Sequence, residues 1–507
     1  MRTLPLTVDE FDGLASGHGS DQALAHLAAG RAAKRRLLLW GAVRDARRLG
    51  LPVEDAVDLL RRALERSAAA VGEVLTHPQV DAWAAGFPDR PDVGYLLELA
   101  AAGAVRAGLP FTVDVTGALH LPGLGLIDAG PARLVFDGSR FTANGEPVPM
   151  RSLHRLDLTD VDGPVVVIDD RDRYRDRYAE PVADRMADPD RFAVQWRAAW
   201  QLLARDHPAH ARAVRALLRS FVPLAPAEGP GERSGVSNRA NGSIAIAPPA
   251  TPAALARLVL HETQHLKLDA LLDLVDLTRG DGRPRHHAPW RGDLRPVRSL
   301  LQGTYAHLGV AEFWRGRDVR QFAYWHGQTA RAAATLAGSG ELTADGERFV
   351  AGMRATLDGW AADPVPAADR HAVQVCTRVS ELVWRLGVRA LPEEATSALV
   401  TAWRAGDPAP SSEGGIRVGR AGGARVRILA AIHGGPVTDG DRELLAGADR
   451  AAAEQFARRI RAGQGTDDDW AGLAVAVDHT TRPEVARDLY PVVRPADPRE
   501  LLRWSAG

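Results

Sequence analysis

The sequence has very little cysteine: Cys376 is the only one in 507 residues. One thiol cannot form a disulfide within the chain or build a thiolate cluster that holds a metal. The chain also has no apolar run long enough to span a bilayer. A signal peptide is not expected either, because acidic residues stand where its apolar segment should be (Asp9, Glu10 and Asp12). These absences predict a cytoplasmic protein without a disulfide framework.

An excess of either charge is missing too. The chain has 63 basic and 64 acidic side chains, and its formal net charge is −1. This balance gives no electrostatic reason to expect binding to nucleic acid or to an anionic membrane surface. The length allows about two to four domains. Nothing in the sequence indicates the oligomeric state.

The pattern of apolar residues divides the chain into four parts. Apolar residues at helical spacing predict helices in residues 20–110 and again after residue 190. Short β-branched segments bounded by Gly, Asp and Pro predict strands between them. We therefore expect a mostly helical α+β protein. Its predicted parts are an N-terminal helical region (1–110), a small β-rich region (111–189), a metal-binding catalytic core (190–362), and a C-terminal helical region with a pair like a tetratricopeptide repeat (363–507).

Several smaller features lead to local expectations. The acidic residues after the last predicted strand of the β-rich region, and a histidine before it, are expected to be turn residues (His154, Asp169, Asp170 and Asp172). The basic residues of 34–36 and 44–48 are expected on the solvated face of a helix. Residues 424–433 look like a strand. The alternating segment SIAIA (243–247) also predicts a strand, one that could be a shelf for an extended peptide.

The chain is organised around an HExxH motif formed by His261, Glu262 and His265. The motif lies in residues 253–277, which contain no Pro or Gly and show the apolar period of a helix. Histidines four residues apart lie one helical turn above each other, so both imidazoles can reach one metal ion. Glu262 is rotated by about 100° from His261 and can reach a molecule bound to the metal. The motif predicts a metal site with a carboxylate beside it.

Two imidazoles do not hold a catalytic ion firmly, so a third ligand is expected. His307, in a helix 41 residues further along the chain, is the best candidate. Glu312 in the same helix is the alternative and would give a His, His, Glu set. Asp269 comes third and suits an outer role, orienting an imidazole. The pair His286 and His287 is in a loop and is expected to be solvated.

Two activities remain open at this point. In a zinc peptidase, Glu262 would be the general base that takes a proton from a metal-bound water. In an iron dioxygenase, the ion would keep positions for a 2-oxo acid and for oxygen, and a cation would bind the distal carboxylate of the acid. Arg291 and Arg295 could be that cation, unless they simply pair with Asp293 at the surface. A third possibility is a peptide-binding scaffold that has lost its activity.

A family resemblance bears on this choice. The segments LHETQHLKLDALLDLVDL, APWRGDLRP and LLQGTYAHLGVAEFWR resemble the actinobacterial HExxH-motif peptide-modification proteins, also described as 2-oxoglutarate-dependent HExxH-type peptide β-hydroxylases. SGVSNRANGSIAIAPP and HPQVDAWAAG resemble other parts of that family. The resemblance is strongest across about residues 230–325.

The resemblance implies an Fe(II) enzyme that uses 2-oxoglutarate and O2. Its reaction would be hydroxylation of a β-carbon in a ribosomally synthesised precursor peptide. His261, His265 and His307 would be iron ligands, and Arg291 or Arg295 would hold 2-oxoglutarate. Glu262 would then bind a ligand of the iron instead of acting in hydrolysis. We expect a zincin-like metal core, with Zn(II) peptidase activity as the alternative.

Overall fold

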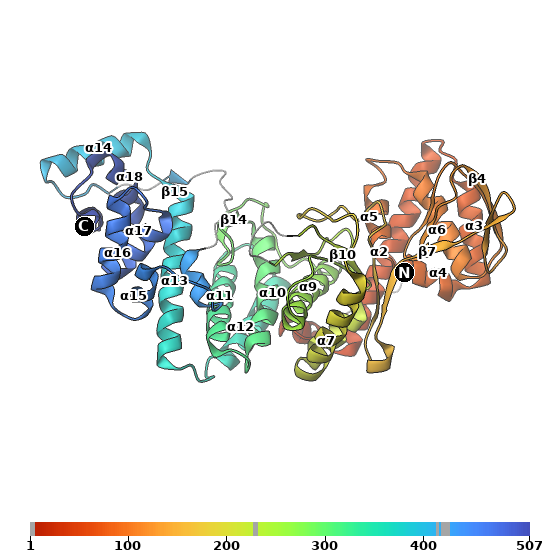
Figure 1. The fold of residues 1–507 in the computed structure, drawn as a ribbon, viewed down its shortest axis with the longest axis horizontal. Coiled ribbons are helices and arrows are strands. Elements are labelled where there is room, and N and C mark those ends of the chain that lie inside the picture. The colour runs from red at the N-terminus through yellow and green to blue at the C-terminus, as the bar shows by residue number, and fades with distance from the viewer. Residues whose placement is uncertain (1–5, 227–231, 412–414, 417–425, 507) are drawn as a thin grey trace. The chain divides into compact units, whose positions relative to one another are not determined.

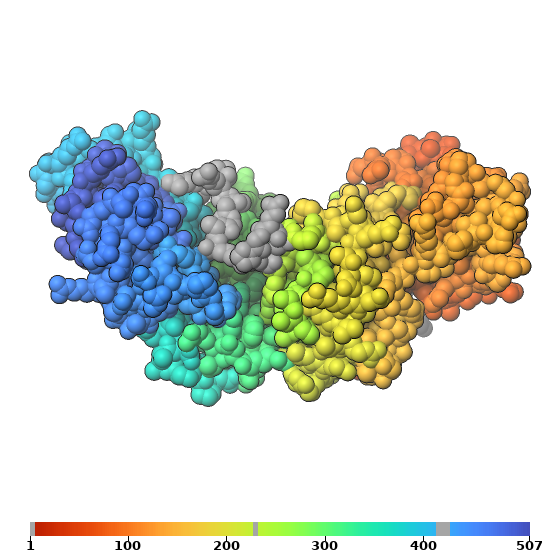
Figure 2. Space-filling view, viewed as in Figure 1, coloured from red at the N-terminus to blue at the C-terminus, as the bar shows by residue number. Residues whose placement is uncertain are grey.

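The computed structural model describes residues 6–226, 232–411, 415–416 and 426–506, which are drawn in colour in Figures 1 and 2. The chain divides into two compact units, Met1–Leu277 and Thr278–Gly507. The metal-binding core predicted for residues 190–362 therefore includes residues of both units. The protein is a mixed α+β protein in which helices predominate, as the sequence predicts. Among the described residues, no helix is both long and apolar enough to cross a lipid bilayer.

The first unit begins with helices that have ordinary caps. The side chains of Thr7 and Ser20 accept hydrogen bonds from the backbone N–H groups of Glu10 and Ala23, which fixes the starts of the first two helices. The second helix is followed by Gly50, whose φ of +67° suits a helix end. The helices are α1 (Val8–Ala15), α2 (Asp21–Arg48), α3 (Glu54–Arg66), α4 (Ala68–Leu75), α5 (Gln79–Gly86) and α6 (Val93–Arg106).

Two small antiparallel sheets follow, with strand orders β1-β4-β5-β6 and β2-β3-β7. Side chains alternate along β1, where Phe111 and Val113 are buried while Thr112 and Asp114 are exposed. The buried face joins one apolar core with α3, α4 and α6, near which Figure 1 shows β4 and β7. The strands are β1 (Phe111–Val115), β2 (Leu119–Leu121), β3 (Gly125–Ile127), β4 (Ala132–Phe136), β5 (Phe141–Ala143), β6 (Glu146–Val148) and β7 (Met150–Ser152).

A five-stranded mixed sheet with the order β11-β12-β10-β9-β8 completes the first unit. Its three inner strands are parallel, and both outer strands are antiparallel to their neighbours. The predicted strand in SIAIA is confirmed as β12, but it lies between two strands and cannot be the shelf for a peptide; β11 is at that edge. The strands are β8 (His154–Asp157), β9 (Val165–Ile168), β10 (Ser220–Pro223), β11 (Ser234–Gly235) and β12 (Ser243–Ile246).

Three helices pack in the same region as this sheet. They are α7 (Pro189–Asp206), α8 (Pro208–Leu217) and α9 (Pro252–Leu272), and both α7 and α8 contact α9. Figure 1 shows α7 beside α9. Trp196 and Trp200 of α7 are buried, as expected for core residues.

The second unit consists mainly of helices, with two short antiparallel strand pairs, β13–β14 and β15–β16, among its described residues. α10 packs against α11, which also contacts α12 and α13. The elements are β13 (His286–His287), β14 (Leu294–Arg295), α10 (Val297–Trp314), α11 (Val319–Ala337), α12 (Ala344–Trp360), α13 (Ala367–Val388), β15 (Arg389–Ala390), α14 (Glu393–Ala405), β16 (Gly415–Ile416), α15 (Asp439–Leu445), α16 (Asp449–Arg461), α17 (Asp467–Ala476), α18 (Pro483–Val493) and α19 (Pro498–Ser505).

The expected strand at residues 424–433 is wrong where the structure describes it. Residues 424 and 425 lie outside the described part, and Arg427–Ala431 form a 3-10 helix. Arg427 binds Asp441 and Asp469 through its guanidinium, and its backbone N–H donates to Asp468 at 2.7 Å. This segment is therefore held by side-chain bonds to later helices instead of by a neighbouring strand.

Candidate metal centre

Helix α9 carries the HExxH motif. The Thr251 side chain accepts a hydrogen bond from the backbone N–H of Ala254 at 3.2 Å, which caps the start of the helix. Pro252 occupies the first turn, where its missing N–H costs nothing. Because α2, α7 and α8 pack against α9, the motif lies within a supported helix. The helical placement predicted for the motif is confirmed.

His261 and His265 lie one turn apart with their ring centroids 4.9 Å from each other and their planes at 79°. Both side chains are half-buried. Two imidazoles on adjacent turns can reach one divalent ion through metal–nitrogen bonds of about 2.0–2.1 Å. This pair therefore fits a metal ion, although it supplies only two of the ligands.

Glu262 is buried beside the imidazole pair, with 3% of its surface exposed. The Ser234 hydroxyl, on the edge strand β11, donates a hydrogen bond to Glu262 Oε1 at 2.7 Å. Burial raises the pKa of Glu262, while His265 and the Ser234 hydrogen bond oppose that rise. A carboxylate with a raised pKa can accept a proton more readily than an exposed one.

Two other polar residues of α9 bind the loop between α1 and α2. Lys267 is 1% exposed, and its ammonium donates to the carbonyl oxygens of Gly17 at 2.5 Å and His18 at 3.0 Å. Gln264 donates to the Gly17 carbonyl at 3.2 Å. A buried ammonium is costly without such partners. These bonds hold the loop, and with it His18, against the HExxH helix.

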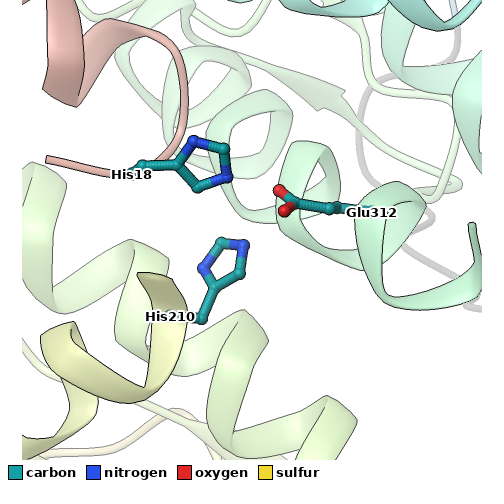
Figure 3. A group of neighbouring side chains, drawn as sticks. All are labelled: His18, His210 and Glu312. Carbon is teal, nitrogen blue, oxygen red and sulfur yellow. The ribbon is translucent and has the colours of Figure 1, made fainter. Parts of the chain in front are cut away.

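His18 meets a histidine from α8. Figure 3 shows the rings of His18 and His210 next to each other, and their centroids are 5.3 Å apart. His210 is 1% exposed, and the His207 ring lies 6.4 Å from it. Sequence reasoning did not single out these histidines; the spacing HPAH at 207–210 was the only signal, and it is weak. Glu312, also labelled in Figure 3, is part of the second unit.

His307 lies on α10 in the second unit and is 8% exposed. Its ring stacks on Trp290 at 3.9 Å and also on Trp325 at 4.9 Å, measured between centroids. Its Nδ1 is 2.8 Å from the carbonyl oxygen of Gly303. A carbonyl can only accept, so Nδ1 carries a proton, and in the neutral ring Nε2 would have the lone pair. That tautomer and fixed orientation suit a metal ligand.

Arg291 and Arg295 both bind Asp293 in the second unit. Arg291 Nε lies 2.9 Å from Oδ1, and Arg295 Nη1 lies 3.0 Å from Oδ2. Burial raises the pKa of Asp293, but the two arginines lower it by more. Of the two expectations for these arginines, the structure thus shows the pairing with Asp293. The segment that contains Arg291 nevertheless contacts His307, because Trp290, which precedes Arg291 in the chain, stacks on the His307 ring.

The other candidate ligands have distinct surroundings. Asp269 is buried on α9, and Glu312 is half-buried on α10. The expectation that His286 and His287 are solvated is wrong. His286 Nε2 is 2.9 Å from Glu341, and the His287 ring stacks on Trp384 with centroids 4.0 Å apart. His286 thus contacts the loop between α11 and α12, and His287 contacts α13.

The structure also contains a polar cluster that sequence reasoning missed. Asp169 and Asp172 were expected to be turn residues; Asp169 Oδ1 does accept from the backbone N–H of Asp172, but both carboxylates are 0% exposed and lie beside His77. Burial lowers the pKa of His77, yet the two carboxylates raise it to about 9. Two features of the sequence could have indicated this cluster: His77 in the segment HPQVD, and the acidic residues that follow the buried strand β9.

A scan against protein-family models finds no match, and a search of curated proteins finds none either.

Proposed function

We propose that this chain is an Fe(II)- and 2-oxoglutarate-dependent hydroxylase that acts on a β-carbon of a ribosomally synthesised precursor peptide. The observation that carries the proposal is the pair of half-buried imidazoles of His261 and His265 on one face of α9. The choice of an oxygenase rests on the sequence resemblance. The bound iron would supply the activation of O2, with electrons from the oxidative decarboxylation of 2-oxoglutarate.

The chain's own residues would have separate tasks. His261 and His265 would hold the ion, and His307 as third ligand stays a prediction from the sequence. Glu262, held by Ser234, would orient a group beside the ion through its second oxygen. Arg291 or Arg295 would bind the distal carboxylate of 2-oxoglutarate, which requires that arginine to give up its bond to Asp293.

A peptide substrate fits the edge strand of the large sheet. β11 pairs only with β12 within the described residues, so its other edge can accept an extended peptide. The same strand provides Ser234, which binds Glu262 of the HExxH helix. An edge strand next to the metal helix is also what a zincin-like core would use to place its substrate.

One observation favours the zinc peptidase as the second candidate. The buried carboxyl of Glu262 has a raised pKa and lies in the same turn of helix as the imidazole pair. A general base in a metallopeptidase needs this position and this property. In that reaction, the peptide bond would be split by water and no oxygen from O2 would be used.

The two candidates differ in their products. The anaerobically purified chain is loaded with Fe(II) and then given 2-oxoglutarate, O2 and the precursor peptide encoded beside its gene. Hydroxylation places one oxygen atom of O2 in the peptide and the other in succinate, with release of CO2. We expect equal amounts of succinate and singly oxygenated peptide. Cleavage without succinate would overturn the proposal in favour of the peptidase.

Variants connect the reaction to the site. His261→Ala is expected to lower both bound iron and hydroxylation by at least ~100-fold, since even outer residues of metal sites contribute about 10–100-fold. His371→Ala, at an exposed position on α13, is the matched control and should leave both unchanged. Full activity of His261→Ala would show that the HExxH metal site takes no part in the reaction.

A further inference from the structure

Two segments of the first unit bring a histidine and two aspartates together in its interior. His77 precedes α5, Asp169 directly follows β9, and Asp172 comes three residues later. Their exposed fractions are 5%, 0% and 0%. Buried ionisable groups are costly unless they are paired or bind a metal. This cluster lies outside the HExxH helix and has no task in the proposed hydroxylation.

The distances between the ligand atoms match a metal site. His77 Nε2 lies 3.2 Å from Asp169 Oδ2 and 3.4 Å from Asp172 Oδ2. The three atoms all lie within 4.8 Å of one another. Metal bonds of about 2.0–2.2 Å in tetrahedral geometry place neighbouring ligand atoms about 3.3–3.6 Å apart. The two short distances are thus close to the edges of such a tetrahedron.

Within the described residues, two of these three atoms have no hydrogen-bond partner, while Asp172 Oδ2 accepts from the Tyr95 hydroxyl. His77 Nε2 and Asp169 Oδ2 are buried without a hydrogen-bond partner, although they lie only 3.2 Å apart. At 3.2 Å the two atoms lie within ion-pair distance, but they do not form a hydrogen bond of good geometry. Both nitrogens of His120, which lies 4.0 Å from Asp172, are unpartnered as well. Orphaned polar atoms in a buried cluster indicate a missing charged or polar occupant.

Surrounding groups hold the three side chains in place. The second oxygen of each carboxylate accepts from backbone N–H groups: Asp169 Oδ1 from residue 172 at 3.1 Å, and Asp172 Oδ1 from Tyr174 at 2.8 Å. The Tyr95 hydroxyl donates to Asp172 Oδ2 at 2.7 Å. The Oδ2 atoms of Asp169 and Asp172 are the oxygens that lie near His77 Nε2, and that of Asp172 is shared with Tyr95. Outer hydrogen bonds of this kind orient the ligands of metal sites.

The His77 ring is also fixed from its other side. Gly123, in the turn between β2 and β3, has a φ of +75°. A Cβ at this position would lie 3.4 Å from both Cγ and Nδ1 of His77. The backbone therefore packs against the Nδ1 side of the ring, and Nε2 is the nitrogen that faces the carboxylates.

We propose that His77, Asp169 and Asp172 form a second, buried site for a first-row divalent cation, Zn²⁺ or Mn²⁺. The imidazole selects against Ca²⁺ and Mg²⁺, which prefer sites made of oxygen atoms alone. The site is structural, because closed sites that lack access to solvent hold a fold together instead of binding substrate. Its ion joins the segment before α5 to the end of β9. This inference does not depend on the proposed hydroxylase activity.

The test uses the full chain with the HExxH pair removed. A His261→Ala/His265→Ala variant is produced in medium supplemented with Zn²⁺ or Mn²⁺, exposed briefly to a chelator, and analysed for metal per chain. We expect about one equivalent to remain, because the buried ligands exchange slowly. Adding Asp172→Asn or His77→Gln should weaken binding by at least ~100-fold. The bound ion should also raise the Tm of the His261→Ala/His265→Ala variant. It should not raise the Tm when either Asp172→Asn or His77→Gln is added.

A surface histidine provides the control. His154 Nε2 lies 3.9 Å from exposed Asp190, so His154→Gln also removes an imidazole near a carboxylate. It should leave the retained metal and its effect on the Tm unchanged. The proposal is overturned if the double variant retains neither metal and its Tm responds to neither. It is equally overturned if Asp172→Asn and His77→Gln retain as much metal as their parent.

Discussion

Arg35 and Asp81 form a two-point ion pair in the interior of the first unit. Nε of Arg35 lies 2.5 Å from Oδ1 of Asp81, and Nη2 lies 2.9 Å from Oδ2. Arg31 binds the same carboxylate at 2.8 Å and also reaches Asp273, which caps the end of α9. One carboxylate thus links α2 to α5, and Arg31 continues the link to the HExxH helix.

Removing the charge of Asp81 should destabilise the first unit strongly. Asp81→Asn removes the carboxylate that Arg35 binds and leaves Arg31 with Asp273 alone, and breaking a buried ion pair costs about 3–5 kcal/mol. Urea unfolding followed by circular dichroism measures the loss. Asp45→Asn is the control, because Asp45 pairs with the exposed Arg44 at 2.9 Å and such pairs contribute about 0–1 kcal/mol. Equal losses in both variants would show that the buried pair has no special role.

The same ion pair is a feature that could not be predicted from the sequence. The basic residues of 34–36 were expected on a solvated face, but Arg35 is 6% exposed. Its burial depends on Asp81, which is 46 residues away in the chain. Asp169 and Asp172 were expected to be turn residues because acidic residues commonly close turns at strand ends, and that expectation did not include their burial. The partner that buries them, His77, comes from a different region, and local patterns do not identify such partners.

Features set by local chemistry were predictable. The HExxH helix is confirmed because an uninterrupted apolar period and a capping threonine both specify it. The strands β1, β4 and β9 were identified from short β-branched runs. The order of strands was not predictable, since β12 became an inner strand through its pairing with the two-residue β11. Ser234 and its bond to Glu262 depend on that pairing.

The stack of Trp290 on His307 predicts that Gly303 tolerates no side chain. A Cβ on Gly303 would lie 2.7 Å from the Trp290 ring, so the ring must move off His307. Overpacking of this kind costs about 1–3 kcal/mol. Gly303→Ala should lower stability by this amount in chemical unfolding and change the tryptophan fluorescence.

Another helical glycine of the same unit is the control. Gly327 lies in α11, and no atom would be within 4 Å of an added Cβ. Gly327→Ala should leave stability unchanged or raise it by up to about 1 kcal/mol, because alanine favours helix. A loss in Gly327→Ala as large as in Gly303→Ala would contradict the steric explanation.

His287 should make the second unit sensitive to acid. Burial, with a smaller effect of Arg331, lowers the pKa of His287 to about 4 from an ordinary value of about 6.5. Between these values the unfolded chain binds more protons, so stability is complete above about pH 6.5 and falls as the pH drops toward 4. We expect His287 to contribute about 3 kcal/mol to this loss.

Trp384 reports on this titration because the His287 ring stacks on it. Unfolding followed by tryptophan fluorescence between pH 4 and 7 gives the dependence. His287→Phe keeps an aromatic ring on Trp384 but has no proton to gain, so the variant should lose less stability on acidification than the parent. Identical pH dependence in both chains would show that His287 is not the group responsible.

Glu262→Gln separates the two candidate reactions. In the unmodified chain, the Ser234 hydroxyl donates to Glu262 Oε1 at 2.7 Å. The amide oxygen of glutamine can still accept this bond, so the helix and the metal content should be unchanged. A hydroxylase should keep its activity within ~10-fold, because Glu262 only orients a group there. A peptidase would lose about 10²–10⁴-fold, the contribution of a general base. Glu232→Gln, which removes an exposed partner of Arg257 on α9, is the control for a lost surface charge. Turnover and metal content, measured on the same samples, distinguish the loss of a base from the loss of the ion.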